Sequence, residues 1–450
     1  MESLVKYLVY KNNPLRYLGI IGLKELHLEA DQVKNRLILD KMNTRFGVYK
    51  KLSNIDRSLA QFLCQESLYT NAAQKIISKI LFSLALPFVA MFFLLKSFKN
   101  STTNVCDVFV FEYGDLDYVR SDFKNRKILT GAAGSTVGSK LGWFEINFLF
   151  RSILKQPQYL LHPKLLVNIL RWLSAYAWVV RYCKPKTIVT FFEGTASCSL
   201  LTEYLHCYHI QHWNYAHGEH FKYDCYSAYA NFDRYVIWGE FFKNIQVEKN
   251  CQSDMFFTRA PDVFKRFYNE IRHSPKINNK HITVLIHSGV QKGKIEYEYL
   301  LRLLRQLNSE WTVLLRPHPV DRSSWPAVLN DLKKDLSSIE SLKIQVKPEY
   351  PEVVPMQESV QRSSIFVSSA SAALLEALLA GCKIIYLPGR IKNKDILERN
   401  QGSLNILYYN DDIEAPLLKE FLETEYLIND SEDNKINYLF ELKNSSHVPK

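Results

Sequence analysis

The sequence predicts an α/β protein with two doubly wound, parallel-sheet domains that follow a helical region. The chain has 450 residues, more than one hydrophobic core usually holds. Short runs rich in β-branched and aromatic residues alternate with longer apolar-periodic segments, which is the pattern of βαβ units. This alternation occurs twice, on either side of the polar stretch "KINNKH" at 276–281. We therefore expect a helical region over 1–100, a first α/β domain over 101–272 and a second over 273–450.

The helical region shows helical spacing of apolar residues in "NIDRSLAQFLCQES" at 54–67 and no strand-like alternation. In the first α/β domain, long apolar-periodic segments at 165–183 and 196–208 predict helices. Strands are expected within the following segments: "DVFVFEY" (107–113), "RKILTGAAG" (126–134), "PKTIVTFFEG" (185–194), "IQHWNYAHGEHF" (210–221) and "FDRYVIWGEFFKNIQ" (232–246), the last of which continues into a helix.

The second α/β domain repeats the pattern with buried strands in "HITVLIHSG" (281–289), "WTVLLRPHP" (311–319) and "SLKIQVKP" (341–348). The segment from Ser364 to Arg390 then reads as strand, turn, helix, strand and turn. "GKIEYEYLLRLLRQLN" (293–308) predicts an amphipathic helix. In open parallel sheets ligands bind outside the carboxyl ends of the strands, so the loops that end these strands are where chemistry is expected.

Composition limits the class of protein. Hydrophobic residues make up 47% and charged residues 23%, which indicates a globular chain. The net charge of +11 suits acidic lipid head groups, nucleotide phosphates or nucleic acid, although a merely basic solvated surface has the same composition. The eight cysteines are irregularly spaced with no CxxC, so we expect buried free thiols in an intracellular, reducing compartment instead of a zinc ribbon or a disulfide framework. No secretory leader is recognisable at the N-terminus.

One apolar segment lies between Lys79 and Lys96 and has 16 residues without a charge. A membrane-spanning helix needs roughly 20 apolar residues, and Pro87 is expected to kink this one. Lysines flank both ends, which favours a helix lying in the interface of an anionic membrane. A buried helix of the first domain and a true span are the alternatives.

Two strand-end loops of the first domain carry ionisable residues. "FFEGTAS" places Glu193 at a strand end, where a carboxylate can act as a general base or simply favour the following helix N-terminus. "NYAHGEHF" gathers His217, Glu219 and His220 around a glycine. Histidine titrates near neutrality and suits proton abstraction or substrate binding. The i, i+3 histidine spacing beside a glycine does not match a helical metal-binding pair, so no metal is expected.

A strand-end loop of the second domain has the sequence "LLRPHPVD" (314–321). Pro317 and Pro319 stiffen the backbone around His318, so that its side chain projects from the end of the strand. Arg316 has a planar, positively charged guanidinium group whose N–H donors match the geometry of a phosphate. A turn histidine without a ligand is the alternative.

A further strand-end loop is "VSSASAALLEALLAG" (367–381), in which Ser368, Ser369 and Ser371 stand between a strand and an apolar helix. Hydroxyls and backbone N–H groups at a helix N-terminus form an anion site, although one serine can also simply cap the helix. Glu376 can face a ligand and hold a ribose hydroxyl, or lie solvated on the surface. Neither GxxxxGK[ST] nor GxGxxG occurs, so no motif supports an ATPase or a dinucleotide-binding protein.

These residues together resemble the GT-B glycosyltransferases, whose two Rossmann-like domains face a cleft. "SSASAALLEALLAGCKIIYLPG" is similar to the donor-site helix of that superfamily, over about 280–400. "RPHP" followed by "VSSAS" resembles the His-Pro and Ser-Ser pair of bacterial sialyltransferases, polysialyltransferases and capsular Kdo transferases, and of CDP-glycerol glycerophosphotransferases. The "HG" of "NYAHGEHF" resembles their acceptor-domain His-Gly. "FFEG" matches the sialyltransferase acidic-Gly motif only in part, because Phe192 replaces its first acidic residue.

The resemblance implies an inverting, metal-independent and cofactor-free transfer of a sugar from CMP-Kdo or CMP-sialic acid to a surface glycan such as capsule or lipopolysaccharide. Arg316, His318 and the serines, with Glu376, would hold the donor. His217 or Glu193 would be the base, and Glu219 and His220 would contact a glycan or lipid-linked glycan acceptor. A basic, apolar segment suits a cytoplasmic enzyme that is peripheral on the inner face of the membrane.

The alternatives are a UDP- or GDP-sugar transferase, a CDP-glycerol-type polymerase and a nonenzymatic basic binding protein. No nucleic-acid motif is present.

Overall fold

The structure is a computed structural model. It describes residues 32–47, 52–70, 72–95, 104–112, 116–132, 141–191, 193–216, 225–272, 280–286, 295–307, 310–317, 325–337, 345–368, 372–387, 405–409, 415–424, 440 and 442.

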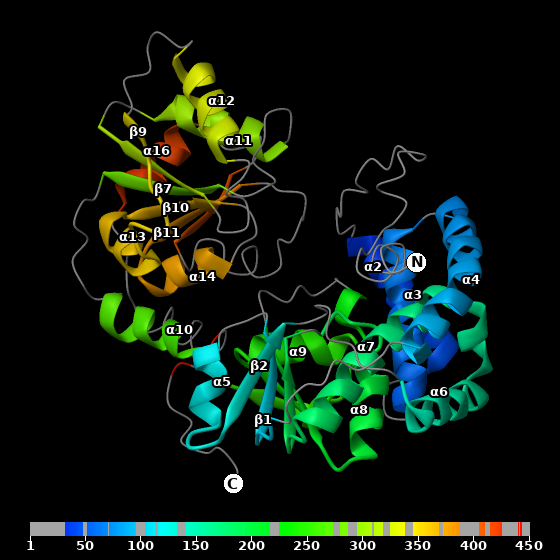
Figure 1. The fold of residues 1–450 in the computed structure, drawn as a ribbon. Coiled ribbons are helices and arrows are strands. Elements are labelled where there is room, and N and C mark those ends of the chain that lie inside the picture. Colours follow the sequence, from blue (N-terminus) through cyan, green and yellow to red (C-terminus); the bar gives the residue numbers. More distant parts are fainter. Residues whose placement is uncertain are drawn as a thin grey trace. The chain divides into compact units, whose positions relative to one another are not determined.

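The chain divides into two compact units, each built on a six-stranded parallel sheet (Figure 1). Unit 1 contains residues 31–238 and 242–258, and unit 2 contains residues 239–241 and 259–450. Two doubly wound parallel-sheet domains with a helical N-terminal region are therefore confirmed. The expected boundaries differ from these units in two places. The described residues between 32 and 95 of the expected helical region pack in unit 1, and the second unit begins at Arg259 instead of at 273.

The sheet of unit 1 has the strand order β2-β1-β3-β4-β5-β6. Every neighbouring pair of its strands is parallel. The chain starts in the interior with β1, moves outward to β2, and then crosses to the other side of β1 for β3 and the following strands. The order reverses between β1 and β3. The strands are β1 (Val108–Glu112), β2 (Ile128–Ala132), β3 (Thr187–Thr190), β4 (Gln211–Tyr215), β5 (Arg234–Ile237) and β6 (Phe256–Thr258).

Alternate residues of β1 enter two different cores. Phe109 and Phe111 pack with α7 (Pro163–Tyr182) and α8 (Cys198–His206) on one face of the sheet. Val108 and Val110 pack with α5 (Leu116–Asp122) on the other face. Both faces are buried because helices cover both, which explains why these strands read as continuous apolar runs in the sequence.

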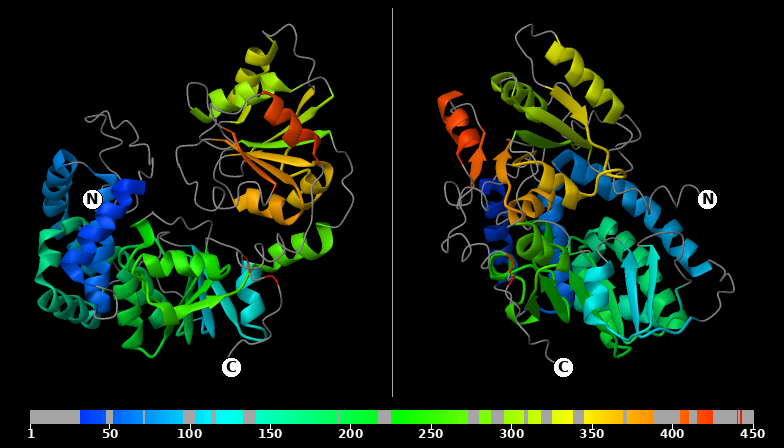
Figure 2. Two further views of the ribbon diagram at one scale, coloured as in Figure 1. Left: turned by 180° about the vertical axis from the view of Figure 1, so that it is seen from behind. Right: turned by 90° about the vertical axis from the view of Figure 1, so that its left-hand side faces the viewer.

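The N-terminal helices α2 (Gln32–Phe46), α3 (Asn54–Tyr69) and α4 (Ala72–Leu95) pack on the α7 and α8 side of unit 1, with α2 against α3. α3 lies against α8, and α4 lies against α7. The remaining helical elements of unit 1 are α6 (Trp143–Lys155), η3 (Pro157–Leu161), η4 (Cys225–Ser227), α9 (Glu240–Glu248) and η5 (Ser253–Met255). Figure 2 shows the blue and teal helices gathered beside the sheet of unit 1.

The sheet of unit 2 has the strand order β12-β11-β10-β7-β8-β9, again entirely parallel. Here the order reverses between β7 and β10. The strands are β7 (His281–Ile286), β8 (Thr312–Pro317), β9 (Gln345–Pro348), β10 (Ile365–Ser368), β11 (Lys383–Tyr386) and β12 (Ile406–Tyr408). The helices are α10 (Asp262–Arg266), the π-helical turn η6 (Phe267–Ile271), α11 (Ile295–Gln306), α12 (Trp325–Ser337), α13 (Met356–Arg362), α14 (Ala372–Leu379) and α16 (Ala415–Glu423).

Residues 259–272 belong to unit 2 because η6 packs against α13 and α14. Gly381 ends α14 with a left-handed φ of +79°, and a Cβ at this position would meet the carbonyl oxygen of Arg272 at 3.1 Å. Glycine therefore allows both the end of the helix and the close approach of the chain that enters the unit.

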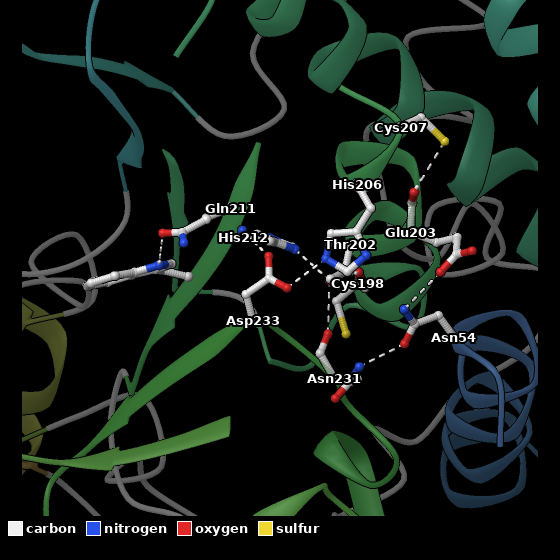
Figure 3. Close-up of polar contacts among 11 residues, drawn as sticks. Asn54, Cys198, Thr202, Glu203, His206, Cys207, Gln211, His212, Asn231 and Asp233 are labelled. Atoms are coloured by element: carbon white, nitrogen blue, oxygen red, sulfur yellow. Dashed lines mark hydrogen bonds and ion pairs between the residues drawn. The ribbon is translucent and has the colours of Figure 1, made fainter. Parts of the chain in front are cut away.

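Buried hydrogen bonds join α7 and α8 to β4 and to the segment before β5, and His212 of β4 is at their centre (Figure 3). The ring nitrogen Nδ1 lies 2.8 Å from Thr202 Oγ1, and Nε2 lies 3.0 Å from Tyr176 Oη. Thr202 Oγ1 donates to the carbonyl of Asn231 at 3.0 Å, so it accepts from Nδ1–H of a neutral imidazole. Burial, assisted by the charge of His206, lowers the pKa of His212 to about 3.

This buried imidazole predicts a pH-dependent stability. In the unfolded chain the pKa of His212 returns to its ordinary value of 6.5, so between about 3 and 6.5 the unfolded state binds one more proton. The free energy of unfolding is therefore highest above this window and decreases as the pH is lowered through it, by about 2 kcal/mol at about pH 5 from this group alone. Urea unfolding across this pH range checks it: His212→Gln should show a shallower dependence than wild type. Parallel curves for the two proteins would contradict the expectation.

Candidate functional site

Glu193 lies in the loop after β3, at the point where the strand order of unit 1 reverses. In doubly wound sheets the loops at such a reversal separate and leave room for a ligand at the carboxyl edge. The half-buried Glu193 side chain accepts a hydrogen bond from Asn214 Nδ2 of β4 at 3.4 Å. Asn214 is itself fixed by Thr190 Oγ1 of β3, which donates to its Oδ1 at 2.9 Å. Two neighbouring strands therefore orient this carboxylate.

Helix α3 holds the backbone of the same loop. Gln61 Nε2 donates to the carbonyl of Glu193 at 2.7 Å, and Gln65 Nε2 donates to the carbonyl of Gly194 at 2.6 Å. Both amides also reach the carbonyl of Tyr226, at 3.3 and 2.8 Å. A Cβ at Gly194 would lie 1.6 Å from the Tyr226 ring, so only glycine allows this packing. The loop is thus built from three segments that are distant in the sequence.

The Glu193 carboxylate affects the pKa of Tyr235 in β5. This tyrosine is fully buried, and burial first and the Glu193 carboxylate second raise the pKa of its phenol far above the ordinary value. Tyr235 consequently stays neutral. The carboxylate at the edge of the sheet is partly open to solvent, accepts a hydrogen bond from the amide of Asn214, and is suited to accept a proton from a hydroxyl.

The predicted residues His217, Glu219 and His220 lie outside the described residues. The chain enters their segment from Ala216, whose N–H donates to the carbonyl of Val236 at 2.9 Å and so extends the pairing of β4 with β5. β4 is the immediate neighbour of β3. In the sequence these three residues therefore follow β4 directly, and Glu193 follows the neighbouring strand β3.

In unit 2, the "VSSAS" segment follows β10, at the reversal between β7 and β10. Ser368 is the last residue of β10. It is completely buried, and its Oγ donates to the carbonyl of Leu285 in β7 at 3.3 Å. This geometry favours a structural role for Ser368, joining the two strands at the reversal, over the donor contact expected from the sequence. Ser369 and Ser371 lie outside the described residues. α14 begins at Ala372, and Glu376 is half-buried in its second turn.

Arg316 is held by contacts inside unit 2. The side chain is 6% exposed, and Nη1 donates to Glu349 Oε1 at 3.0 Å and to the carbonyl of Val354 at 2.7 Å. Ser359 Oγ donates to the same Glu349 oxygen at 2.5 Å. Both Nη1 protons are used inside the unit, so Arg316 is better assigned to supporting the end of β8. His318 lies outside the described residues, two positions after Arg316.

Four positioning residues escaped the sequence reasoning: Gln61, Gln65, Thr190 and Asn214. The two glutamines lie four residues apart on α3, which is one helical face, but nothing in the sequence shows what that face covers. Thr190 directly precedes "FFEGTAS" and Asn214 is the first residue of "NYAHGEHF", so both stand at the strand ends that the sequence predicts.

The described residues contain no group of three or more His, Cys, Asp and Glu side chains arranged to hold a metal ion. All eight cysteines are free, and all except Cys207 are buried, as the sequence predicts for structural thiols.

No protein-family model and no curated protein sequence matches the chain. Several solved structures are similar to it. The lipopolysaccharide outer core galactosyltransferase WaaB, in its apo form, has a TM-score of 0.41 at 14% identity, over 80% of this chain and 92% of WaaB. A UDP-GlcNAc 2-epimerase of Methanocaldococcus jannaschii, in complex with UDP-GlcNAc and UDP, has a TM-score of 0.46 at 12% identity, over 74% of this chain and 96% of the epimerase. The UDP-forming α,α-trehalose-phosphate synthase of Burkholderia xenovorans has a TM-score of 0.40 at 11% identity, over 76% and 96%. Values of this size do not assign a shared activity.

Proposed function

We propose that the protein is a GT-B-type glycosyltransferase that moves a sugar from a nucleotide-activated donor to a hydroxyl of a bacterial surface glycan. One observation supports this more than any other. The loop of Glu193 and the "VSSAS" loop, which were singled out by their residue types alone, each follow the strand at which the order of their sheet reverses. Each unit thus has chemistry-bearing residues at the position where doubly wound sheets bind ligands.

In this proposal unit 2 binds the donor. Ser369 and Ser371, with the N-terminus of α14, provide hydroxyl and N–H donors for a phosphate that leaves with negative charge. His318 contacts the nucleotide from the neighbouring end of β8, and Glu376 holds a ribose hydroxyl. β8 and β10 are separated only by β7, so their carboxyl ends are about 10 Å apart, a span that a nucleotide covers.

Unit 1 supplies the base. Glu193 or His217 takes the proton of the acceptor hydroxyl as its oxygen forms the new bond to the anomeric carbon, and the nucleotide leaves from the opposite side. Direct attack inverts the anomeric configuration. The negative charge that develops on the leaving group is met by the donors of unit 2.

The donor that we favour is a CMP-activated sugar, Kdo or sialic acid, because "RPHP" and "VSSAS" follow the pattern of those transferases. UDP- and GDP-sugars and a CDP-glycerol-type donor are the other candidates. A titration calorimetry panel of CMP, CDP, UDP and GDP separates them.

We expect cytidine nucleotides to bind and His318→Ala to weaken that binding by about tenfold, the effect of one lost hydrogen bond to a charged or polar group. The exposed Arg305→Met serves as the surface control and should leave the affinity unchanged. Binding of UDP or GDP alone would refute the cytidine preference and leave the transferase class standing. Binding of none of the four would overturn the proposed function.

A further inference from the structure

Helix α4 has one face inside the protein and one face outside. Phe82, Ala85, Val89 and Phe93 are buried, and three of them pack in the core shared with α7. The helix continues through Pro87 for 24 residues, about 36 Å. The opposite face presents a stripe of large apolar residues at helical spacing, with exposed fractions from 41% at Met91 to 72% at Leu95: Ile76, Ile80, Leu84, Phe88, Met91 and Leu95.

The end of α4 is joined to the start of α6, which also exposes large apolar residues. Leu141, just before α6, donates its N–H to the carbonyl of Phe93 at 2.9 Å, which joins the end of α4 to the start of α6. α6 and η3 expose six more large apolar side chains, among them Trp143 at 80%: Trp143, Phe144, Phe150, Leu154, Leu160 and Leu161. Leu86 of α4 and Phe148 and Leu149 of α6 also pack against the same two buried cores of unit 1. α4 and α6 therefore border the same part of unit 1.

The charged groups on these elements are nearly all positive. α4 carries Lys75 and Lys79 and no acidic residue, and the exposed charges of α6 are Arg151 and Lys155. The one carboxylate of α6, Glu145, is buried and paired with Arg181. Glu66 of α3, shortly before α4 in the chain, has a side chain that is only 18% exposed and lies 3.9 Å from His162 Nδ1.

We propose that α4, α6 and η3 form a surface that inserts into one leaflet of an anionic phospholipid membrane. Monomeric soluble proteins rarely expose apolar patches of this extent, and basic residues at the rim match acidic head groups. An exposed tryptophan near such a rim suits the headgroup level of a bilayer. This inference goes beyond the proposed function and does not depend on which donor is used.

Insertion into one leaflet fits the structure better than crossing. By length and composition alone α4 is long and apolar enough to span a bilayer. Its buried face, however, is part of the core of unit 1, so a span would require the helix to leave α7 and expose Phe82, Val89 and Phe93. If α4 stays packed against α7 and only its outer face enters the lipid, the helix keeps its core contacts and also buries its exposed apolar residues.

Flotation of the full-length protein with vesicles tests the surface. Vesicles of phosphatidylcholine alone and vesicles that also contain phosphatidylglycerol are compared at low and high salt. We expect binding to the anionic vesicles, and a reduction on the order of tenfold or more in Leu84→Glu/Phe88→Glu, because each change puts a charge where the lipid would be. Leu417→Glu is the matched control: a partly exposed leucine on a helix of unit 2, which should bind as wild type does.

Lys79→Glu/Arg151→Glu should lose most of the preference for phosphatidylglycerol. Nucleotide titration of the same preparations shows that the variants are folded, and it separates failure of this inference from failure of the proposed function. Equal flotation of wild type and Leu84→Glu/Phe88→Glu would overturn the inference. The inference would also be overturned if wild type did not bind vesicles but formed a dimer, and Leu84→Glu/Phe88→Glu dissociated that dimer. Retention of wild type in cell membranes after alkaline carbonate extraction would show a spanning helix and also overturn it.

Discussion

Glu193→Gln is expected to lower kcat by roughly a thousandfold while leaving donor affinity within about twofold of wild type, because a general base contributes on this scale and the amide cannot accept the proton. Glutamine keeps the shape of the side chain, and its oxygen can still accept from Asn214 Nδ2, so the loop should remain in place. Single-turnover transfer with saturating donor and acceptor, together with nucleotide titration, measures the two quantities separately.

Glu203→Gln provides the control for this prediction. Glu203 is half-buried like Glu193 and accepts a hydrogen bond from Asn54 Nδ2 at 3.2 Å, but it lies on α8 away from the strand ends. It should retain wild-type kcat. If Glu193→Gln also retains it, the base is not Glu193, and His217 becomes the residue to test.

Arg316→Met is expected to destabilise unit 2 by about 3–5 kcal/mol, because it leaves the buried carboxylate of Glu349 without its cation. The affinity of the folded protein for nucleotide should stay within about twofold, since the loss of one phosphate contact would instead cost tenfold or more. Urea unfolding followed at several temperatures gives the stability, and titration at a temperature where the variant is folded gives the affinity.

Two further variants separate the structural role of Arg316 from a direct contact. Glu349→Gln should lose stability as Arg316→Met does, because it removes the other partner of the same ion pair. Arg305→Met, on the exposed side of α11, should change neither quantity. A stable Arg316→Met with strongly weakened nucleotide binding would restore the phosphate contact that the sequence suggested.

The strands could be predicted from the sequence because both faces of these sheets are covered by helices. A strand buried on both faces is a continuous apolar run, and "TIVT" of β3 and "IFVS" of β10 show this directly. β6 and β12 were not predicted, since each has only three residues and lies at a sheet edge where less apolar surface is buried. α6 was not predicted, although its apolar and polar residues are segregated as on an amphipathic helix, and its apolar residues Trp143, Phe150 and Leu154 are exposed.

The candidate site could be predicted in part. Glu193 was found because a carboxylate at the end of an apolar run is unusual. Gln61 and Gln65, which hydrogen-bond to the backbone of its loop, could not be predicted, because their partners are 132 and 129 residues away in the sequence. The ion pair of Arg316 could not be predicted for the same kind of reason: its partner Glu349 follows 33 residues later in a segment without any motif.

The sequence by itself determined the alternation of strands and helices, the two α/β units and the strand-end loops that carry ionisable and hydroxyl side chains, because these follow from local periodicity and residue type. Only the tertiary structure decided the order of the strands, and with it the position of the Glu193 and "VSSAS" loops at the two reversals. It also decided that Arg316 and Ser368 are internal, and that one face of α4 is buried while the other is exposed. Each of these depends on contacts between residues far apart in the chain, and local composition carries no record of such contacts.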